Sequence, residues 1–146
     1  MKTEIEKFSP CEDALVFRKK YKTFMGAWNN CPRGDWMLWI AQRLDVDIRT
    51  LTLAKGYCAK TVIHLMKDQR SKDAVKAAID FGRGKIDKEQ LKKTADAADA
   101  AASYAAYAAD AAAYAAAAAR IKNQKATANI CRKYLTKAVM DKIKAL

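Results

Sequence analysis

Histidine is almost absent from this sequence, and cysteine is sparse and scattered. The single imidazole is His64, and the four cysteines, Cys11, Cys31, Cys58 and Cys131, include no Cys-x-x-Cys pair. Structural zinc sites and small disulfide frameworks are normally built from closely spaced Cys and His residues. The composition therefore argues against a metal centre. We expect reduced thiols that act as small buried hydrophobic residues.

Turn-forming residues are also few, with five glycines and two prolines among 146 residues. A β-sandwich or a collagen-like repeat requires many more. Apolar residues make up 51% of the chain and charged residues 30%, which excludes a wholly disordered protein. A chain of this length is typical of one domain of ordinary size. The composition predicts an all-α, single-domain fold over residues 1–146.

A long uninterrupted apolar run is missing as well. No stretch reaches the roughly 18 apolar residues of a membrane-spanning helix, because Asp96, Asp99 and Asp110 interrupt the alanine-rich tract. The first seven residues, Met-Lys-Thr-Glu-Ile-Glu-Lys, do not resemble the apolar core of a signal peptide. We therefore expect a cytoplasmic protein without a membrane partner.

Acidic residues are in deficit. The chain has 28 Lys and Arg against 16 Asp and Glu, a net charge of +12. Residues 120–146 contain eight basic residues and one acidic residue, whereas residues 95–119 contain three acidic residues and no basic one. A positive field attracts an acidic protein, a nucleic acid or an anionic membrane. The charge by itself does not choose among these partners.

Apolar periodicity predicts a bundle of about six helices around a long alanine-rich helix. The expected segments are tryptophan-containing helices within 9–66, a short helix at 71–82, the alanine-rich helix at 88–120 and a basic C-terminal helix at 125–144. Gly82-Arg83-Gly84 is expected to end one helix, and Asn123-Gln124 to separate the last two. The residues expected to act as N-caps are Ser9, Thr23, Asp35, Asp47, Ser71 and Asp87.

The alanine-rich helix has one polar and aromatic face. Alanine, the strongest helix former, occupies 18 of the 25 positions in 95–119. A tightly packed central helix with one solvated face is the simpler interpretation, and its alanine face could also form a homodimer. The alternative is a docking surface, because tyrosine is favoured at interfaces. The candidate partner-binding residues are Asp99, Tyr104, Tyr107, Asp110 and Tyr114.

Support for catalysis is weak. His64 lies between Ile63 and Leu65 on a predicted helix, a setting more typical of a core or groove residue than of a general base. Gly82-Arg83-Gly84-Lys85 is too short for a phosphate-binding loop, and no serine or cysteine lies in a nucleophile-elbow pattern. We predict that the protein is not an enzyme and uses no cofactor.

Trp28, Trp36 and Trp39 form the densest aromatic group of the sequence. Trp36 and Trp39 are three residues apart on one helical face, and Trp28 can pack back across the intervening turn. Asp35 is placed to cap the helix that carries the second and third tryptophans. We interpret these four residues as a structural motif that anchors the core.

The tryptophan segment also carries a family resemblance. The protein resembles immunity proteins with an Imm-5-like domain in the stretch Ala27-Trp28-x-x-Cys31-Pro32-Arg33-Gly34-Asp35-Trp36-Met37-Leu38-Trp39 and in the downstream alanine-rich helix with its Asp and Tyr residues. The likeness covers residues 24–135. It implies an all-α, non-catalytic protein that binds and neutralises a cognate bacterial toxin. Asp35, Trp36 and Trp39 match the shared segment, and no family binding residue is carried over.

The lysine-rich character of this chain departs from that family. A basic inhibitor suggests an acidic surface on its target, where charge complementarity raises the association rate. The alternative is a basic nucleic-acid-associated protein of a mobile element or phage. Basic residues at 18–22 and 122–137 could follow phosphates, although no recognisable DNA-reading motif accompanies them.

Overall fold

The computed structural model describes residues 2–94 and 117–146, and all regular structure within these ranges is helical. Residues 88–94 form the first turns of a further helix. The predicted all-α, single-domain fold is confirmed. In chain order, the elements are the 3-10 helix η1 (Glu6–Phe8), the α-helices α1 (Glu12–Lys19), α2 (Phe24–Asn30), α3 (Gly34–Arg43) and α4 (Ile48–Lys60), the 3-10 helix η2 (Ile63–Leu65), and the α-helices α5 (Gln69–Gly82) and α7 (Ala117–Lys144).

Three of the predicted N-caps are confirmed. The Thr23 hydroxyl accepts a hydrogen bond from a backbone amide of α2 at 3.0 Å, and the Asp47 carboxylate does the same for α4 at 3.1 Å. Asp87 accepts from the Gln90 amide at 2.9 Å, while the Gln90 side chain accepts from the Asp87 amide at 3.1 Å. This reciprocal pair is a capping box, which satisfies two amides that lack partners within the helix.

The predicted caps at Ser9 and Ser71 are wrong. Ser9 adopts a left-handed conformation with φ 55° and ends η1, so α1 begins two residues later than expected, after Cys11. Ser71 lies inside α5, which is capped instead by Asp68; the Asp68 carboxylate accepts from the Arg70 amide at 2.8 Å. A carboxylate is a stronger acceptor than a hydroxyl, and it comes first along the chain.

One predicted helix end moves and another is confirmed. The helix expected to reach residue 66 ends at Lys60, and His64 lies in the separate short helix η2. The Thr61 hydroxyl donates to the Cys58 carbonyl at 2.7 Å, which satisfies one of the last carbonyls of α4. The predicted stop at Gly82-Arg83-Gly84 is confirmed, because α5 ends at Gly82 and Gly84 has φ 79°.

The predicted break at Asn123-Gln124 is wrong, because α7 runs through both residues without interruption. Asn123 Nδ2 donates to Thr61 Oγ1 at 2.8 Å, so its side chain joins α7 to the end of α4. Asn and Gln cost only a few tenths of a kcal/mol in a helix, and this contact favours continuity. Ala117–Arg120, assigned to the alanine-rich helix, therefore belongs to the same helix as the basic C-terminal residues.

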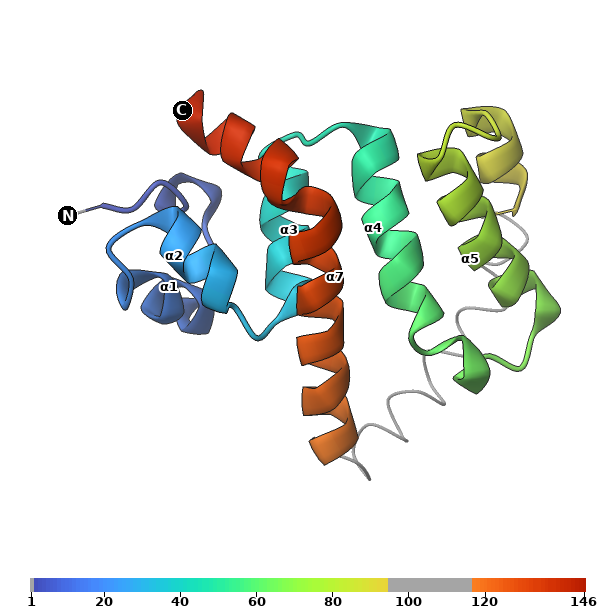
Figure 1. Ribbon diagram of the computed structural model, residues 1–146, viewed down its shortest axis with the longest axis horizontal. Helices are drawn as coiled ribbons and strands as arrows, with labels where there is room; N and C mark the ends of the chain where they lie inside the picture. Colours follow the sequence, from blue (N-terminus) through green and yellow to red (C-terminus); the bar gives the residue numbers. More distant parts are fainter. Residues whose placement is uncertain (1, 95–116) are drawn as a thin grey trace.

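Helix α7 lies at the centre of the described bundle (Figure 1). It packs against α3 and α4, and α4 in turn packs against α5. Helices α1 and α2 lie at the opposite end from α5, next to the N-terminal segment (Figure 1). The sequence predicted that the alanine-rich helix at 88–120 lies at the centre of the bundle. Most of its residues lie outside the described ranges, so this stays a prediction.

The core lies where α7 meets α2, α3 and α4. The central side chains of α7 are fully buried, and they meet buried residues of the three neighbouring helices. A second apolar contact joins α4 to α5, where Phe81 is fully buried. The largest side chains without solvent exposure are Phe81, Met37, Leu135, Val139 and Cys131.

Candidate functional site

Trp28 is the aromatic anchor that the sequence predicted. It is 3% exposed, and its ring stacks on Phe24 with the ring centres 6.0 Å apart. The indole Nε1 donates to the Thr136 hydroxyl of α7 at 2.9 Å, so burial leaves no unsatisfied donor on the ring. Trp28 therefore joins α2 to α7 and is unavailable to a partner.

Arg132 holds the end of the same helix. This side chain of α7 donates from Nη1 to the Cys31 carbonyl at 2.7 Å and to the Trp28 carbonyl at 3.2 Å. Both carbonyls lie at the C-terminal end of α2, where the Trp28 carbonyl also accepts from the Cys31 amide at 3.3 Å. Asn129 accepts from the other end of the guanidinium at 2.7 Å. The charge of Arg132 is therefore used inside the fold, although the sequence grouped it with the phosphate-binding candidates.

Gly34 explains the glycine of the Gly-Asp-Trp segment. A Cβ placed there would lie 2.2 Å from Thr127 Oγ1 and 2.7 Å from the Thr127 carbonyl carbon. The first turn of α3 thus rests directly on the backbone of α7. The Cys131 thiol also lies 3.7 Å from the Gly34 carbonyl. Any side chain at position 34 would separate the two helices, so the glycine has a packing role.

The sequence predicted that Asp35 caps α3, and this prediction is wrong. The N-cap residue is Arg33. The Asp35 carboxylate instead accepts two hydrogen bonds from Arg33, at 2.6 Å and 2.9 Å. This pairing lowers the pKa of Asp35 below its ordinary value. The guanidinium carbon lies 4.6 Å from the centre of the Trp36 ring. Arg33 thus outcompetes the backbone amides for the carboxylate and covers the half-buried indole.

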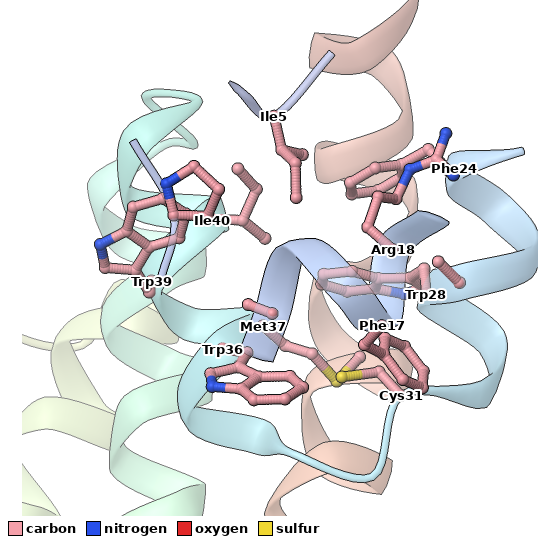
Figure 2. A pocket seen from close by; sticks show the side chains of 13 residues that line it. Ile5, Phe17, Arg18, Phe24, Trp28, Cys31, Trp36, Met37, Trp39 and Ile40 are labelled. Atoms are coloured by element: carbon pink, nitrogen blue, oxygen red, sulfur yellow. The ribbon is translucent and has the colours of Figure 1, made fainter. Parts of the chain in front are cut away.

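The tryptophans line a small apolar cavity between α1, α2, α3 and the N-terminal segment (Figure 2). Trp36 and Trp39 lie on one side of it, with Trp28 and Phe17 on the other. Its volume is about 60 Å³, far below the roughly 300–1,000 Å³ of ordinary ligand sites. The cavity has room for a side-chain-sized apolar group at most. Trp28 is buried in the core, and Trp36 and Trp39 are half-buried against it.

Three of the four cysteines are buried as expected, but Cys11 is exposed, which contradicts the prediction for that residue. The Cys58 thiol of α4 donates to the Thr127 carbonyl at 3.8 Å, and the Cys131 thiol of α7 donates to the Gly34 carbonyl at 3.7 Å. The neighbouring Cys58 thiol together with burial raises the pKa of Cys131. Burial likewise raises the pKa of Cys31. With raised pKa values, Cys31 and Cys131 stay protonated near neutral pH and behave as small apolar residues rather than nucleophiles.

His64 is exposed on η2, so its predicted place in the core or a groove is wrong. The helix that was expected to bury it ends four residues earlier. Within residues 2–94 and 117–146, no group of three or more His, Cys, Asp or Glu side chains is arranged to hold a metal ion. No described helix combines the length and apolar character that a membrane crossing requires.

The predicted docking stripe of the alanine-rich helix lies outside the described residues. Its members are Asp99, Tyr104, Tyr107, Asp110 and Tyr114, and their proposed role stays a prediction. Among the described residues, the surfaces with exposed charged side chains that could bind a partner lie on α7 and at the neighbouring edges of α4 and α5.

The outer face of α7 carries a row of lysines, which we call the lysine face: Lys122, Lys125, Lys133, Lys137 and Lys144. All five side chains are exposed, and helical geometry places them within about 120° of arc over about 33 Å. Asp141 is the one acidic residue in the sequence of α7, and it pairs with Lys137 at 3.4 Å. The other lysines of the face have no carboxylate within 4.0 Å among the described residues.

A second arrangement, the tyrosine row, crosses α5, α4 and α7 and consists of Arg83, Tyr57, Tyr134 and Lys133. The Tyr57 and Tyr134 rings stack with centres 4.8 Å apart and planes 3° from parallel. The Arg83 guanidinium donates to the Tyr57 hydroxyl, and Lys133 Nζ lies 5.2 Å from the centre of the Tyr134 ring. Lys133 belongs to both arrangements, so the tyrosine row meets the lysine face there.

Sequence reasoning missed the tyrosine row. Neither Tyr57 nor Tyr134 is among the candidate binding residues that the sequence predicted. The sequence did contain a sign of the position of Tyr57. Helical periodicity places Tyr57 at the edge of the apolar face formed by Leu51, Ala54 and Cys58. The stacking of the two rings depends on how α4 and α7 are aligned, which a single sequence does not state.

Comparison with protein-family models, with curated proteins and with solved structures finds no match to this chain. A function has to be inferred from the surfaces of the molecule itself and from the resemblance of its tryptophan segment.

Proposed function

We propose that this protein is a non-catalytic binding protein that captures an acidic protein partner on the lysine face of α7. In line with the resemblance of the tryptophan segment to Imm-5-like immunity proteins, the partner is a cognate bacterial toxin. The protein neutralises that toxin by forming a stoichiometric complex that covers a functional surface.

The lysine face is the observation that carries this proposal. Like charges that lie three or four residues apart repel each other and destabilise a helix by a few tenths of a kcal/mol per pair. Lys133 and Lys137 are one such pair, and both are exposed. A surface with this cost and no internal use for most of its charge is best explained by an external acidic partner.

The opposite side of α7 keeps this face in a fixed shape. Cys131, Leu135 and Val139 are fully buried, and Arg132 and Thr136 are hydrogen-bonded to α2. A preorganised helix loses little conformational entropy when it binds, which favours tight association. The lysine side chains themselves supply long-range attraction, which raises the association rate.

The proposal is tested with a purified partner. Affinity purification from the native host identifies candidate proteins, and each candidate is then produced separately and titrated against this protein by calorimetry. We expect a complex of fixed stoichiometry and loss of the partner's toxic activity at the equivalence point. A partner that keeps full activity when saturated contradicts neutralisation.

Nucleic acid is the competing partner, and salt dependence separates the two classes. A protein that contacts several phosphates loses affinity steeply as salt rises, by about 10³–10⁵ between 50 and 200 mM for six to ten contacts. We expect weak binding to a 20-base-pair DNA duplex at physiological salt. Micromolar or tighter binding with that slope, and no protein partner, would overturn the proposal.

A further inference from the structure

The tyrosine row offers a set of hydrogen-bond donors at one exposed position. Because the Tyr57 oxygen accepts a hydrogen bond from Arg83, the Tyr57 hydroxyl proton is free to be donated to another group. Arg83 has five N–H donors and uses one of them for Tyr57. The guanidinium and the phenol therefore present donors side by side at the surface.

This chemistry suits a carboxylate. A guanidinium binds a carboxylate through two parallel hydrogen bonds, and such charge-assisted bonds are about twice as strong as neutral ones. Lys133 at the other end of the tyrosine row adds a second positive charge. No carboxylate of the described residues lies within 4.0 Å of Arg83 or Lys133.

We propose that the tyrosine row is the energetic centre of the interface, where Arg83, Tyr57 and Lys133 bind aspartate or glutamate carboxylates of an acidic segment of the partner. This inference rests on the proposed function, because it names the part of the surface that recognises the partner. Arginine and tyrosine are enriched among the residues that dominate binding energy. The remaining lysines of α7 then supply attraction and orientation around this centre.

The arrangement of the rings favours a carboxylate over a nucleic-acid base. Proteins that bind single strands stack successive bases on aromatic faces. Here one face of each tyrosine ring is covered by the other ring, and a cation lies over each ring as well. The tyrosine row therefore offers hydrogen-bond donors and charge, and it offers no open pair of aromatic faces to stacked bases.

The test uses two labelled probes and fluorescence anisotropy. The first probe is a 20-residue poly-L-glutamate, and the second is a 20-nucleotide oligothymidine. Arg83→Gln is compared with Lys76→Gln, since both remove one exposed positive charge, one at the end of α5 and one within it. Lys133→Gln is compared in the same way with Lys142→Gln, which removes an exposed charge of α7 that lies outside the lysine face.

We expect Arg83→Gln and Lys133→Gln to raise the dissociation constant for poly-L-glutamate about fivefold or more, and each control about twofold or less. Tyr57→Phe keeps the stacked ring and removes the hydroxyl, so it should weaken binding about threefold without changing the melting temperature. Melting curves of all variants identify any loss that comes from unfolding.

The outcomes distinguish the claim that the tyrosine row is the energetic centre from the proposed function as a whole. Equal losses in Arg83→Gln and Lys76→Gln would show that only net charge matters, which overturns the energetic centre and leaves the proposed function in place. No binding of poly-L-glutamate by the wild-type protein would overturn both. Tighter binding of oligothymidine, weakened by Arg83→Gln, would assign the tyrosine row to phosphates and contradict the carboxylate assignment.

Discussion

The tryptophan segment and the lysine face of α7 use similar residue types in opposite ways. In the tryptophan segment, Arg33 pairs with Asp35 and covers Trp36, and Trp28 is hydrogen-bonded to α7. On the lysine face, Lys122, Lys125 and Lys133 are exposed and have no carboxylate partner among the described residues. The polar groups of the tryptophan segment, the most conspicuous part of the sequence, are therefore engaged in contacts within the fold. The less conspicuous lysines are the ones left for a partner.

The two regions are opposite sides of one packing arrangement. Arg132 and Thr136 point from α7 into the tryptophan segment and hold it, while Lys133 and Lys137 point to solvent on the same turns of helix. Helix α7 thus has a structural side and a candidate binding side. Substitutions on one side should change stability alone, and substitutions on the other should change binding alone.

The largest expected effect on stability comes from Gly34→Ala. The added methyl group would collide with Oγ1 and Cβ of Thr127 and also with its carbonyl carbon, a backbone atom that cannot move aside without shifting α7. Such overpacking costs about 3 kcal/mol of unfolding free energy. Gly84→Ala is the matched control: no atom lies within 4 Å of its Cβ, although φ is 79°, so strain of about 1 kcal/mol is expected. Urea denaturation measures both, and a similar small loss in each would contradict the close α3–α7 contact.

A comparison within α7 should give the next largest difference. Arg132→Ala removes the donor of the Cys31 carbonyl and one of the two donors of the Trp28 carbonyl, which should cost about 2 kcal/mol. Lys125→Ala removes an exposed charge from the other side of α7 and should stay within about 0.5 kcal/mol of the wild-type protein. Both values come from chemical denaturation at one pH and salt concentration. Equal losses would mean that α7 has no separate structural side.

Trp28→Phe tests the hydrogen bond between the indole and Thr136. Phenylalanine retains most of the aromatic packing but has no N–H to donate, so the loss should be about 1 kcal/mol from the bond plus a contribution from the smaller ring. Trp39→Phe serves as a reference, because Trp39 is half-buried and no hydrogen bond of its indole is seen among the described residues. Thermal unfolding ranks the two variants, and a larger loss for Trp39→Phe would be inconsistent with the anchoring role of Trp28.

The smallest expected effect is an acid dependence in the region packed around the tryptophans. Burial alone would raise the pKa of Glu4, but hydrogen bonds from Arg18 outweigh it and lower this pKa from 4.5. A carboxyl whose folded pKa is lowered stabilises the fold fully above its unfolded pKa, and this contribution is lost as pH falls through the lower folded pKa. Stability should therefore fall below about pH 4.5.

Glu4→Gln is the control for this acid dependence. It cannot titrate, so its unfolding free energy should change less between about pH 6 and about pH 3 than that of the wild-type protein. Denaturation curves at the two pH values measure the difference. An identical pH dependence in the two proteins would exclude the Glu4–Arg18 pair as its source.

Local features of the fold were readable from the sequence because they depend on neighbouring residues. The caps at Thr23, Asp47 and Asp87 and the stop at Gly82 each follow from side chains within a few positions. Asp35 shows where this reasoning fails, since a charged neighbour competed for the carboxylate. Propensity also could not show that Asn123 bonds to Thr61, 62 positions earlier.

The candidate site was less predictable than the fold. The sequence identified the basic C-terminal helix, and the helical period separates its lysines from its buried residues. It did not place Arg83, Tyr57 and Tyr134 together, because that requires the alignment of three helices. It also grouped Arg132 with the exposed basic residues, although tertiary contacts use its charge inside the protein.

The most direct test of the central claim is charge reversal on the lysine face, measured against the purified protein partner. Lys125→Glu, Lys133→Glu and Lys137→Glu together are compared with Lys20→Glu, Lys22→Glu and Lys76→Glu, three exposed lysines outside α7. Both variants undergo the same change in net charge. We predict that the α7 variant loses affinity by a factor of about 100 or more with an unchanged melting temperature, while the control loses less than about tenfold. Equal losses, or retained affinity in the α7 variant, would contradict the claim that this face binds the partner.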